Sequence, residues 1–137
     1  ALCSGGAAGA DRAAQDACLA HGGSAVIFPA GRLTDCPAQE HVLYLAEQAY
    51  DAPFSTPRAL GRNYLIHAMG EKTLVAQCQA GSGGTWDGTT ENLKHGWSPV
   101  FVHDDGTPGA RALIERGAAA VRALGRLDEL QPEQLHF

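Results

Sequence analysis

The feature that most constrains this fold is a glycine-rich stretch near the start of the chain, Ser4–Asp11, with the sequence SGGAAGAD. It lies between a short apolar run, Ala1–Cys3, and an alanine-rich amphipathic segment. Glycines allow the backbone to turn sharply and to approach a ligand closely. A helix that begins after such a turn presents free N–H groups and the positive end of its dipole, which suit a phosphate. The order strand, glycine loop, helix therefore predicts an anion-binding arrangement.

Short apolar runs alternate with helical patterns along the rest of the chain. Apolar runs predict strands at 24–28, 72–76, 98–102 and 118–121, and apolar spacing predicts helices near 10–18, 42–49, 58–69, 85–95 and 110–117. A second glycine-rich turn, Gly81–Thr85, follows the run at 72–76. This alternation is typical of an α/β fold with a mainly parallel sheet. We expect one domain over 1–127, followed by a polar C-terminal tail over 128–137.

Both glycine turns follow predicted strands, so we expect both at the carboxyl edge of the sheet, where open parallel sheets bind ligands. Two helix N-termini at that edge would hold a phosphate or a nucleotide. A helix start nearby carries an arginine that could clamp a phosphate bidentately, followed by an asparagine that could hold a base. The candidate ligand-binding residues are Ser4, Gly5, Gly6, Gly9, Arg62, Asn63, Ser82, Gly83, Gly84 and Thr85.

Several site classes are excluded by spacing. The first loop lacks the GxGxxG spacing of dinucleotide-binding folds and the Lys-Ser/Thr of a Walker loop, which argues against NAD and against ordinary NTP hydrolysis. The four cysteines are far apart and the histidines show no zinc pattern, so we expect no metal ion. No residue pattern predicts a catalytic group or a cofactor.

The charge of the chain limits its partners. The formal net charge is −5, and ten Lys and Arg residues form no basic run. Strong non-specific nucleic-acid binding requires a basic surface, so any nucleic-acid contact would be local. The chain shows no signal peptide and no apolar run long enough to span a bilayer, which predicts a cytoplasmic protein without a membrane partner.

The motifs, taken together, resemble those of the DprA/Smf DNA-processing family. Residues 4–11 resemble the SGxARGxD motif of that family, and 61–66 resemble its RNRIIAG segment. Residues 82–85 with Asn92, Leu93 and Gly96 resemble its SGSLxTAxxAxxxGR segment. Residues 99–102 and 113–118 resemble the VFAVPG and LIxxGA elements that follow. These matches occur in order over nearly the whole chain.

The resemblance implies a Rossmann-like three-layer sandwich from which the first strand-helix unit, with a GSR-type turn, is missing in this chain. It also implies non-catalytic binding of single-stranded DNA or a nucleotide in DNA recombination, a RecA-type recombinase as partner, and self-association as a homodimer. The chain departs from the motifs at Ala8 and Tyr64, where the family has arginines. Each lost arginine–phosphate contact weakens DNA binding, which favours a small nucleotide as ligand.

Two alternatives remain open at this point. The wider superfamily includes the Lonely guy enzymes, so the chain could be a nucleoside monophosphate phosphoribohydrolase, or else a nucleotide sensor that regulates a partner. Gly88-Thr89 follows Gly83-Gly84 only after three residues, and Glu91 stands one position too near Thr89 for the Lonely guy motif GGxGTxxE. Asp11 lies where a carboxylate complements the helix dipole, which favours a structural role. Trp86 could stack on a base or pack against the sheet.

Overall fold

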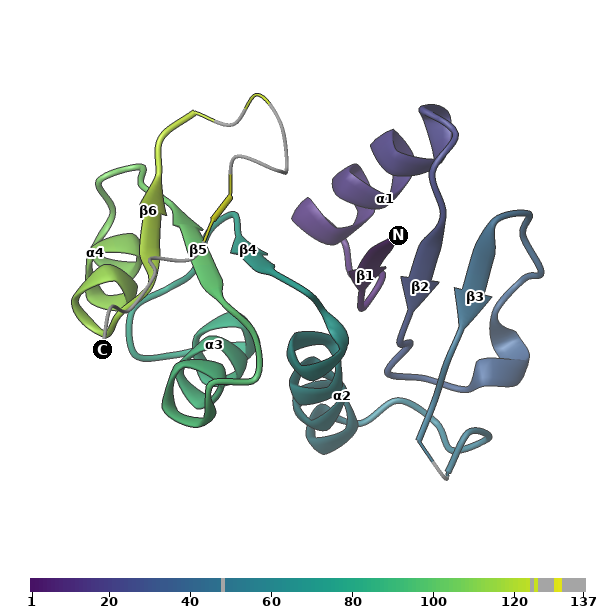
Figure 1. Ribbon diagram of the computed structural model, residues 1–137. Coiled ribbons are helices and arrows are strands. Elements are labelled where there is room, and N and C mark those ends of the chain that lie inside the picture. Colours follow the sequence, from purple (N-terminus) through teal and green to yellow (C-terminus); the bar gives the residue numbers. More distant parts are fainter. Residues whose placement is uncertain (48, 124, 126–129, 132–137) are drawn as a thin grey trace. The chain divides into compact units, whose positions relative to one another are not determined.

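The computed structural model describes residues 1–47, 49–123, 125 and 130–131 (Figure 1). The chain divides into two compact units, Ala1–Met69 and Gly70–Phe137. Each unit contains a parallel sheet of three strands flanked by helices, which confirms the predicted α/β, Rossmann-like class. The polar tail predicted over 128–137 lies outside the described residues except for 130–131. The single domain over 1–127 stays a prediction.

The first unit has the strand order β1-β2-β3, with both pairs parallel. Its elements are β1 (Leu2–Ser4), α1 (Ala10–Ala20), β2 (Ala25–Ile27), a short 3-10 helix (Leu33–Asp35), β3 (Val42–Tyr44) and α2 (Thr56–Met69). Helix α1 packs on β1 and β2, and α2 packs on β1. Helix α1 stops at a His21-Gly22 turn, where Gly22 has a φ of 80° that glycine adopts without strain.

The helix predicted over 42–49 is wrong, because Val42–Tyr44 forms strand β3. The apolar residues at 42, 45, 46 and 49 match helical spacing, but Val-Leu-Tyr is also a strand-forming run. Parallel pairing of Ala25 with Val42 and of Ile27 with Tyr44 decides between the two structures. A tertiary contact therefore overrides the local periodicity here.

The second unit has the strand order β4-β5-β6, again with both pairs parallel. Its elements are β4 (Thr73–Val75), α3 (Gly84–His95), β5 (Val100–His103), α4 (Pro108–Glu115) and β6 (Ala119–Val121). All five lie where the sequence predicts them, to within a few residues. Helices α3 and α4 contact each other, and both pack on β5, the central strand.

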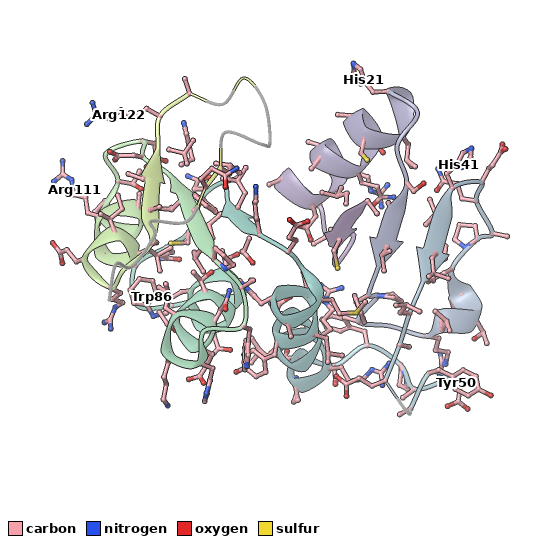
Figure 2. All side chains as sticks on the ribbon, viewed as in Figure 1. His21, His41, Tyr50, Trp86, Arg111 and Arg122 are labelled. Atoms are coloured by element: carbon pink, nitrogen blue, oxygen red, sulfur yellow. The ribbon has the colours of Figure 1, made fainter. Side chains whose placement is uncertain are left out.

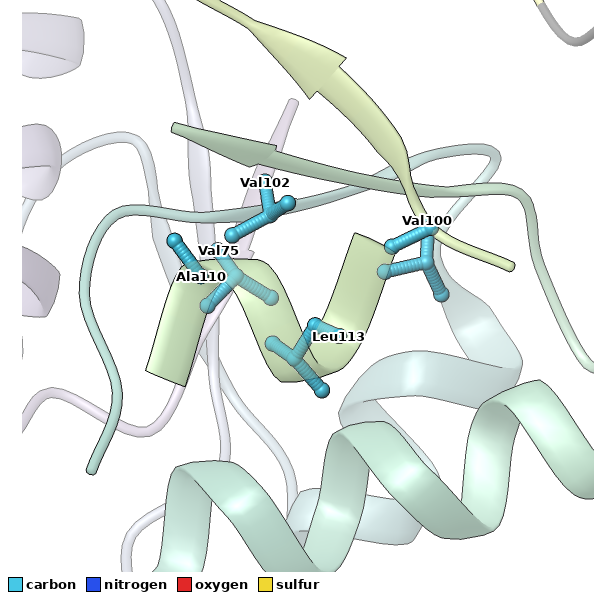
Figure 3. Close-up of a cluster of buried hydrophobic side chains, with 6 residues drawn as sticks. Val75, Val100, Val102, Ala110 and Leu113 are labelled. Carbon is cyan, nitrogen blue, oxygen red and sulfur yellow. The ribbon is translucent and has the colours of Figure 1, made fainter. Parts of the chain in front are cut away.

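The core of the second unit lies between its sheet and α4. Val75, Val100 and Val102 project from the strands toward Ala110 and Leu113 of α4 (Figure 3). Leu113 is completely buried. Removing such a side chain from water contributes about 1.5–3 kcal/mol to folding. This core holds β4, β5 and α4 in one register, and so fixes the loops that leave the carboxyl ends of the two strands.

Helix α3 is fixed by a buried polar contact at its far end. Asn92 is fully buried, its Oδ1 accepts the Ser98 N–H at 3.0 Å, and its Nδ2 donates to the Ser98 hydroxyl at 3.1 Å. Buried amides that are hydrogen-bonded in this way specify a single orientation. The contact anchors α3 to the residues just before β5, so its N-terminus has a defined position at the other end.

Candidate phosphate-binding sites

The first glycine loop leaves the carboxyl end of β1, and its N–H groups are largely used within the chain. The Gly5 and Ala7 N–H groups donate to Asp11 Oδ2 at 3.2 and 3.3 Å. The Gly6 N–H donates to the hydroxyl of Ser4, a buried residue, at 3.2 Å. Gly9 caps α1 with a φ of 93° and has no side chain to accept a hydrogen bond. The carboxylate of Asp11 therefore lies on donors that a phosphate would use.

Arg62, on α2, contacts the same loop from the other side. Its Nη1 donates to the carbonyl oxygens of Gly5 at 2.6 Å and Phe28 at 2.9 Å. A Cβ atom on Gly5 would lie 2.7 Å from Arg62 Cζ, so the guanidinium would have to shift to admit a larger residue there. Burial lowers the pKa of the Arg62 guanidinium, and the negative charge of Asp11 opposes that shift. Arg62 thus ties the ends of β1 and β2 to α2, and Asn63 lies beside it, half-buried.

Arg58 is a structural residue that the sequence did not single out. Its guanidinium donates to the carbonyl oxygens of Ala30, Ala49 and Gly31 at 3.2, 2.7 and 3.4 Å. It stands one helical turn before Arg62, and this spacing on one helix was the available signal. Both arginines line a hollow of about 20 Å³, enough for about one water. That hollow is too small for a phosphate.

The second glycine loop follows β4 and leads into α3. Gly81 and Gly83 have φ angles of 76° and 90°, and Gly83 is the N-cap of α3 without any side-chain cap. Ser82 and Thr85 are exposed. Within the described part of the chain, neither the N–H nor the hydroxyl of Thr85 has a hydrogen-bond partner. The start of α3 therefore has donors that face solvent.

These residues line an open hollow of about 600 Å³, within the range of roughly 300–1,000 Å³ that is usual for small-molecule sites. Its described walls carry amides, hydroxyls and backbone, and no charged side chain. The lining residues are Gln77, Cys78, Gln79, Ala80, Ser82, Gly83, Gly84, Thr85, Thr107, Pro108 and Gly109. All four residues predicted for the second loop lie in this wall.

The N-terminus of α4 forms the opposite part of the wall and is capped. The Thr107 hydroxyl accepts the Ala110 N–H at 3.4 Å and donates to Asp105 Oδ1 at 2.6 Å. The hydrogen bonds from Thr107 lower the pKa of Asp105. A Cβ on Gly109 would overlap the carbonyl oxygen of Cys78, so α4 approaches the loop after β4 as closely as a glycine allows. Of the two helix starts, that of α3 is the one without a side-chain cap.

Trp86 and Glu91 both have structural partners. Trp86 packs against the core of the second unit, and the Arg116 guanidinium lies 5.1 Å from its ring centroid. Glu91 pairs along α3 with His95 at 3.2 Å and Lys94 at 4.0 Å. Figure 2 shows the labelled Arg111 and Arg122 extending outward from this unit, and neither lines the hollow. The site therefore offers dipoles rather than cations.

Other site classes find little support in the described residues. No group of three or more His, Cys, Asp or Glu side chains among them is placed to bind a metal ion. All four cysteines are free and half-buried. None of the helices described is both long enough and apolar enough to cross a membrane.

The parallel sheets, with glycine loops at their carboxyl edges, define a Rossmann-like protein. The family model of DNA recombination-mediator protein A matches residues 1–130, so the chain belongs to that family. No curated protein sequence matches the chain significantly.

A solved structure, that of DNA processing protein A (DprA) from Streptococcus pneumoniae, has the same fold. It matches with a TM-score of 0.73 and 24% identity over 87% of this chain. The match covers 47% of the pneumococcal chain, so the present chain spans about half the length of that relative. At this identity the likeness shows the fold alone.

Proposed function

We propose that this chain binds single-stranded DNA or a nucleotide without acting on it chemically, with phosphates held at its glycine loops. The observation that carries the proposal is the uncapped N-terminus of α3 in the wall of an open hollow of about 600 Å³. Such a terminus binds anions through its N–H groups and the helix dipole. Membership of a DNA recombination-mediator family supports DNA as the source of the phosphate.

A mononucleotide is the second candidate ligand, and a specific observation favours it. The described walls of the hollow carry no charged side chain, and the chain has a net charge of −5. A site of this kind can neutralise few phosphates. For a single strand, each neutralised phosphate contributes about −0.7 to the slope of log K against log salt. We therefore expect a slope of about −0.7 to −1.4, corresponding to one or two phosphates.

Fluorescence anisotropy of labelled oligo-dT with the wild-type chain, at low and moderate salt, tests the proposal. The matched variants are Thr85→Glu and Thr85→Gln. Glutamate in the first turn suits the helix dipole and so preserves the fold, but its charge repels a phosphate. We expect Thr85→Glu to abolish binding and Thr85→Gln to retain most of it. Equal binding by both variants would place the phosphate elsewhere, and absence of wild-type binding at low salt would refute DNA binding.

Competition separates the two ligands and the enzymatic alternative. Displacement of oligo-dT by AMP at concentrations where inorganic phosphate has no effect would select the mononucleotide. Release of adenine from AMP would contradict non-catalytic binding and select a phosphoribohydrolase instead. Since Glu91 is engaged with His95 and Lys94, we expect no release.

The proposal extends, by resemblance to the family, to a homodimer and to a RecA-type recombinase as partner. Sedimentation velocity over a range of concentrations tests the first, and co-sedimentation with a recombinase filament tests the second. A monomer at all concentrations, or a filament that leaves the chain in solution, would remove these two partners from the proposal and leave ligand binding intact.

A further inference from the structure

In the first glycine loop, the backbone N–H groups already bind an anion of the chain itself, the carboxylate of Asp11. Asp11 Oδ2 accepts from the N–H groups of Gly5 and Ala7 at 3.2 and 3.3 Å, toward the long end of the hydrogen-bonding range. Its charge also acts on Arg62, whose guanidinium is hydrogen-bonded to the Gly5 carbonyl oxygen. One carboxylate therefore accepts hydrogen bonds from two backbone N–H groups and partly neutralises the charge of a guanidinium. An external phosphate meets a loop that is already neutralised.

A second, independent feature indicates that this arrangement is not the only one the loop is built for. Gln15 of α1 is 6% exposed, and its buried Oε1 has no hydrogen-bond partner among the described residues. Gln15 Oε1 lies 3.9 Å from the position of a Cβ on Gly6, which places the amide against the loop. A buried amide without a partner is unfavourable. Because Oε1 accepts hydrogen bonds, a phosphate would be bound by the Nε2 donor of the same amide after a half-turn of the side chain.

We propose that the first loop is an anion site held closed by Asp11, which a phosphate group opens by displacing the carboxylate. Displacement frees the Gly5 and Ala7 N–H groups, lets the charge of Arg62 act on the phosphate in place of Asp11, and brings a phosphate oxygen to the Nε2 donor of Gln15. Asp11 thereby acts as a built-in competitor that weakens binding at this loop. The inference rests on the proposed function for the ligand class, and concerns the regulation of one of its two loops.

Residue-resolved amide NMR of the full chain, titrated with inorganic phosphate, tests the inference. The variant is Asp11→Asn, which keeps the side-chain shape and removes the charge, and the matched control is Asp16→Asn on the exposed side of the same helix. We expect the Gly5 and Ala7 amides of Asp11→Asn to respond at phosphate concentrations at least five-fold lower than in the wild type. Asp16→Asn should match the wild type. No response of these two amides in Asp11→Asn would overturn the inference.

A second variant keeps the test decisive if Asp11→Asn fails to fold. Gln15→Leu should raise the melting temperature, because an unpartnered buried amide becomes apolar, and should weaken the response of Gly5 and Ala7 at high phosphate in the otherwise wild-type chain. If Gln15→Leu leaves that response unchanged, or if the wild type gives none, the loop is only a structural turn. The Thr85 amide reports the proposed function separately, so failure of one does not imply failure of the other.

Discussion

The two glycine loops begin from nearly the same local sequence but end in different states. In the first, the N–H groups of Gly5 and Ala7 are bound by Asp11, and Arg62 presses on Gly5 from α2. In the second, Gly83 is an uncapped helix start in an open hollow. The difference comes from the side chains nearby rather than from the glycines. A glycine-rich turn before a helix is therefore a potential anion site, and its neighbours decide whether it is accessible.

We expect the largest effect at the close contact between Gly109 of α4 and Cys78, in the wall of the hollow beside the second loop. Gly109→Ala would force a methyl group onto the carbonyl oxygen of Cys78, a backbone atom that cannot rotate away. Overpacking costs about 1–3 kcal/mol, occasionally more, and because this clash is with backbone we expect a loss of about 3 kcal/mol or more, with α4 pushed away from the loop after β4. Urea unfolding of the variant should show this loss, together with weaker oligo-dT binding.

Gly31→Ala is the matched control for Gly109→Ala, since a Cβ there would have nothing within 4 Å. Its stability should equal or slightly exceed that of the wild type. If Gly109→Ala is as stable as Gly31→Ala, the close approach of α4 is not what shapes the hollow. Another feature would then have to explain why the second loop is open and the first is not.

We expect the next largest effect at Arg62, which links α2 to the first loop by hydrogen bonds. Arg62→Met removes charge-assisted hydrogen bonds to Gly5 and Phe28 and leaves Asp11 without a nearby cation. We expect a loss of about 1.5–3 kcal/mol in the free energy of unfolding, reduced by the partial exposure of the side chain. Thermal and urea unfolding measure it. Oligo-dT binding should change little, because the open loop lies in the other unit.

Arg12→Met is the control for this substitution, because Arg12 is exposed on α1. It should be neutral within about 0.5 kcal/mol, as is usual for surface positions. A large loss of oligo-dT affinity in Arg62→Met with unchanged stability would reverse the assignment and make Arg62 a ligand-binding residue.

The smallest effect should come from Gly5→Ala. The new methyl group would meet Arg62 Cζ at 2.7 Å, but a guanidinium at the end of a flexible side chain can move where a backbone carbonyl cannot. We expect a cost of about 1 kcal/mol, the lower end of the overpacking range, and a smaller loss than for Gly109→Ala. Amide NMR should show the change at Gly5 and Phe28. A loss that exceeds that of Gly109→Ala would mean that the first loop is the more rigid of the two.

Much of the fold could be predicted from the sequence because it depends on local patterns. Short apolar runs gave every strand except β3, and the glycines at the ends of α1 and in the turn before α3 lie where the structure needs a positive φ. Strand β3 was mistaken for a helix because the apolar residues from Val42 onward match helical spacing, while Val42–Tyr44 is also a strand-forming run. Only its pairing with β2 decides between the two structures. The structural role of Arg58 could not be predicted because its acceptors, three backbone carbonyls, lie 9 to 28 residues away in sequence.

The sequence by itself determined the α/β class, the parallel strands and the positions of both glycine loops. These depend on residue type and spacing within short windows. Which loop is open was decided by contacts that form only in the folded chain. The Asp11 carboxylate meets the Gly5 N–H, six residues away, only once α1 has formed, Arg62 reaches Gly5 across 57 residues, and Gly109 meets Cys78 when α4 packs in the second unit. Hydrogen bonds and steric contacts act over a few ångströms in space, so both a local carboxylate and residues far apart in the sequence set the state of the loops.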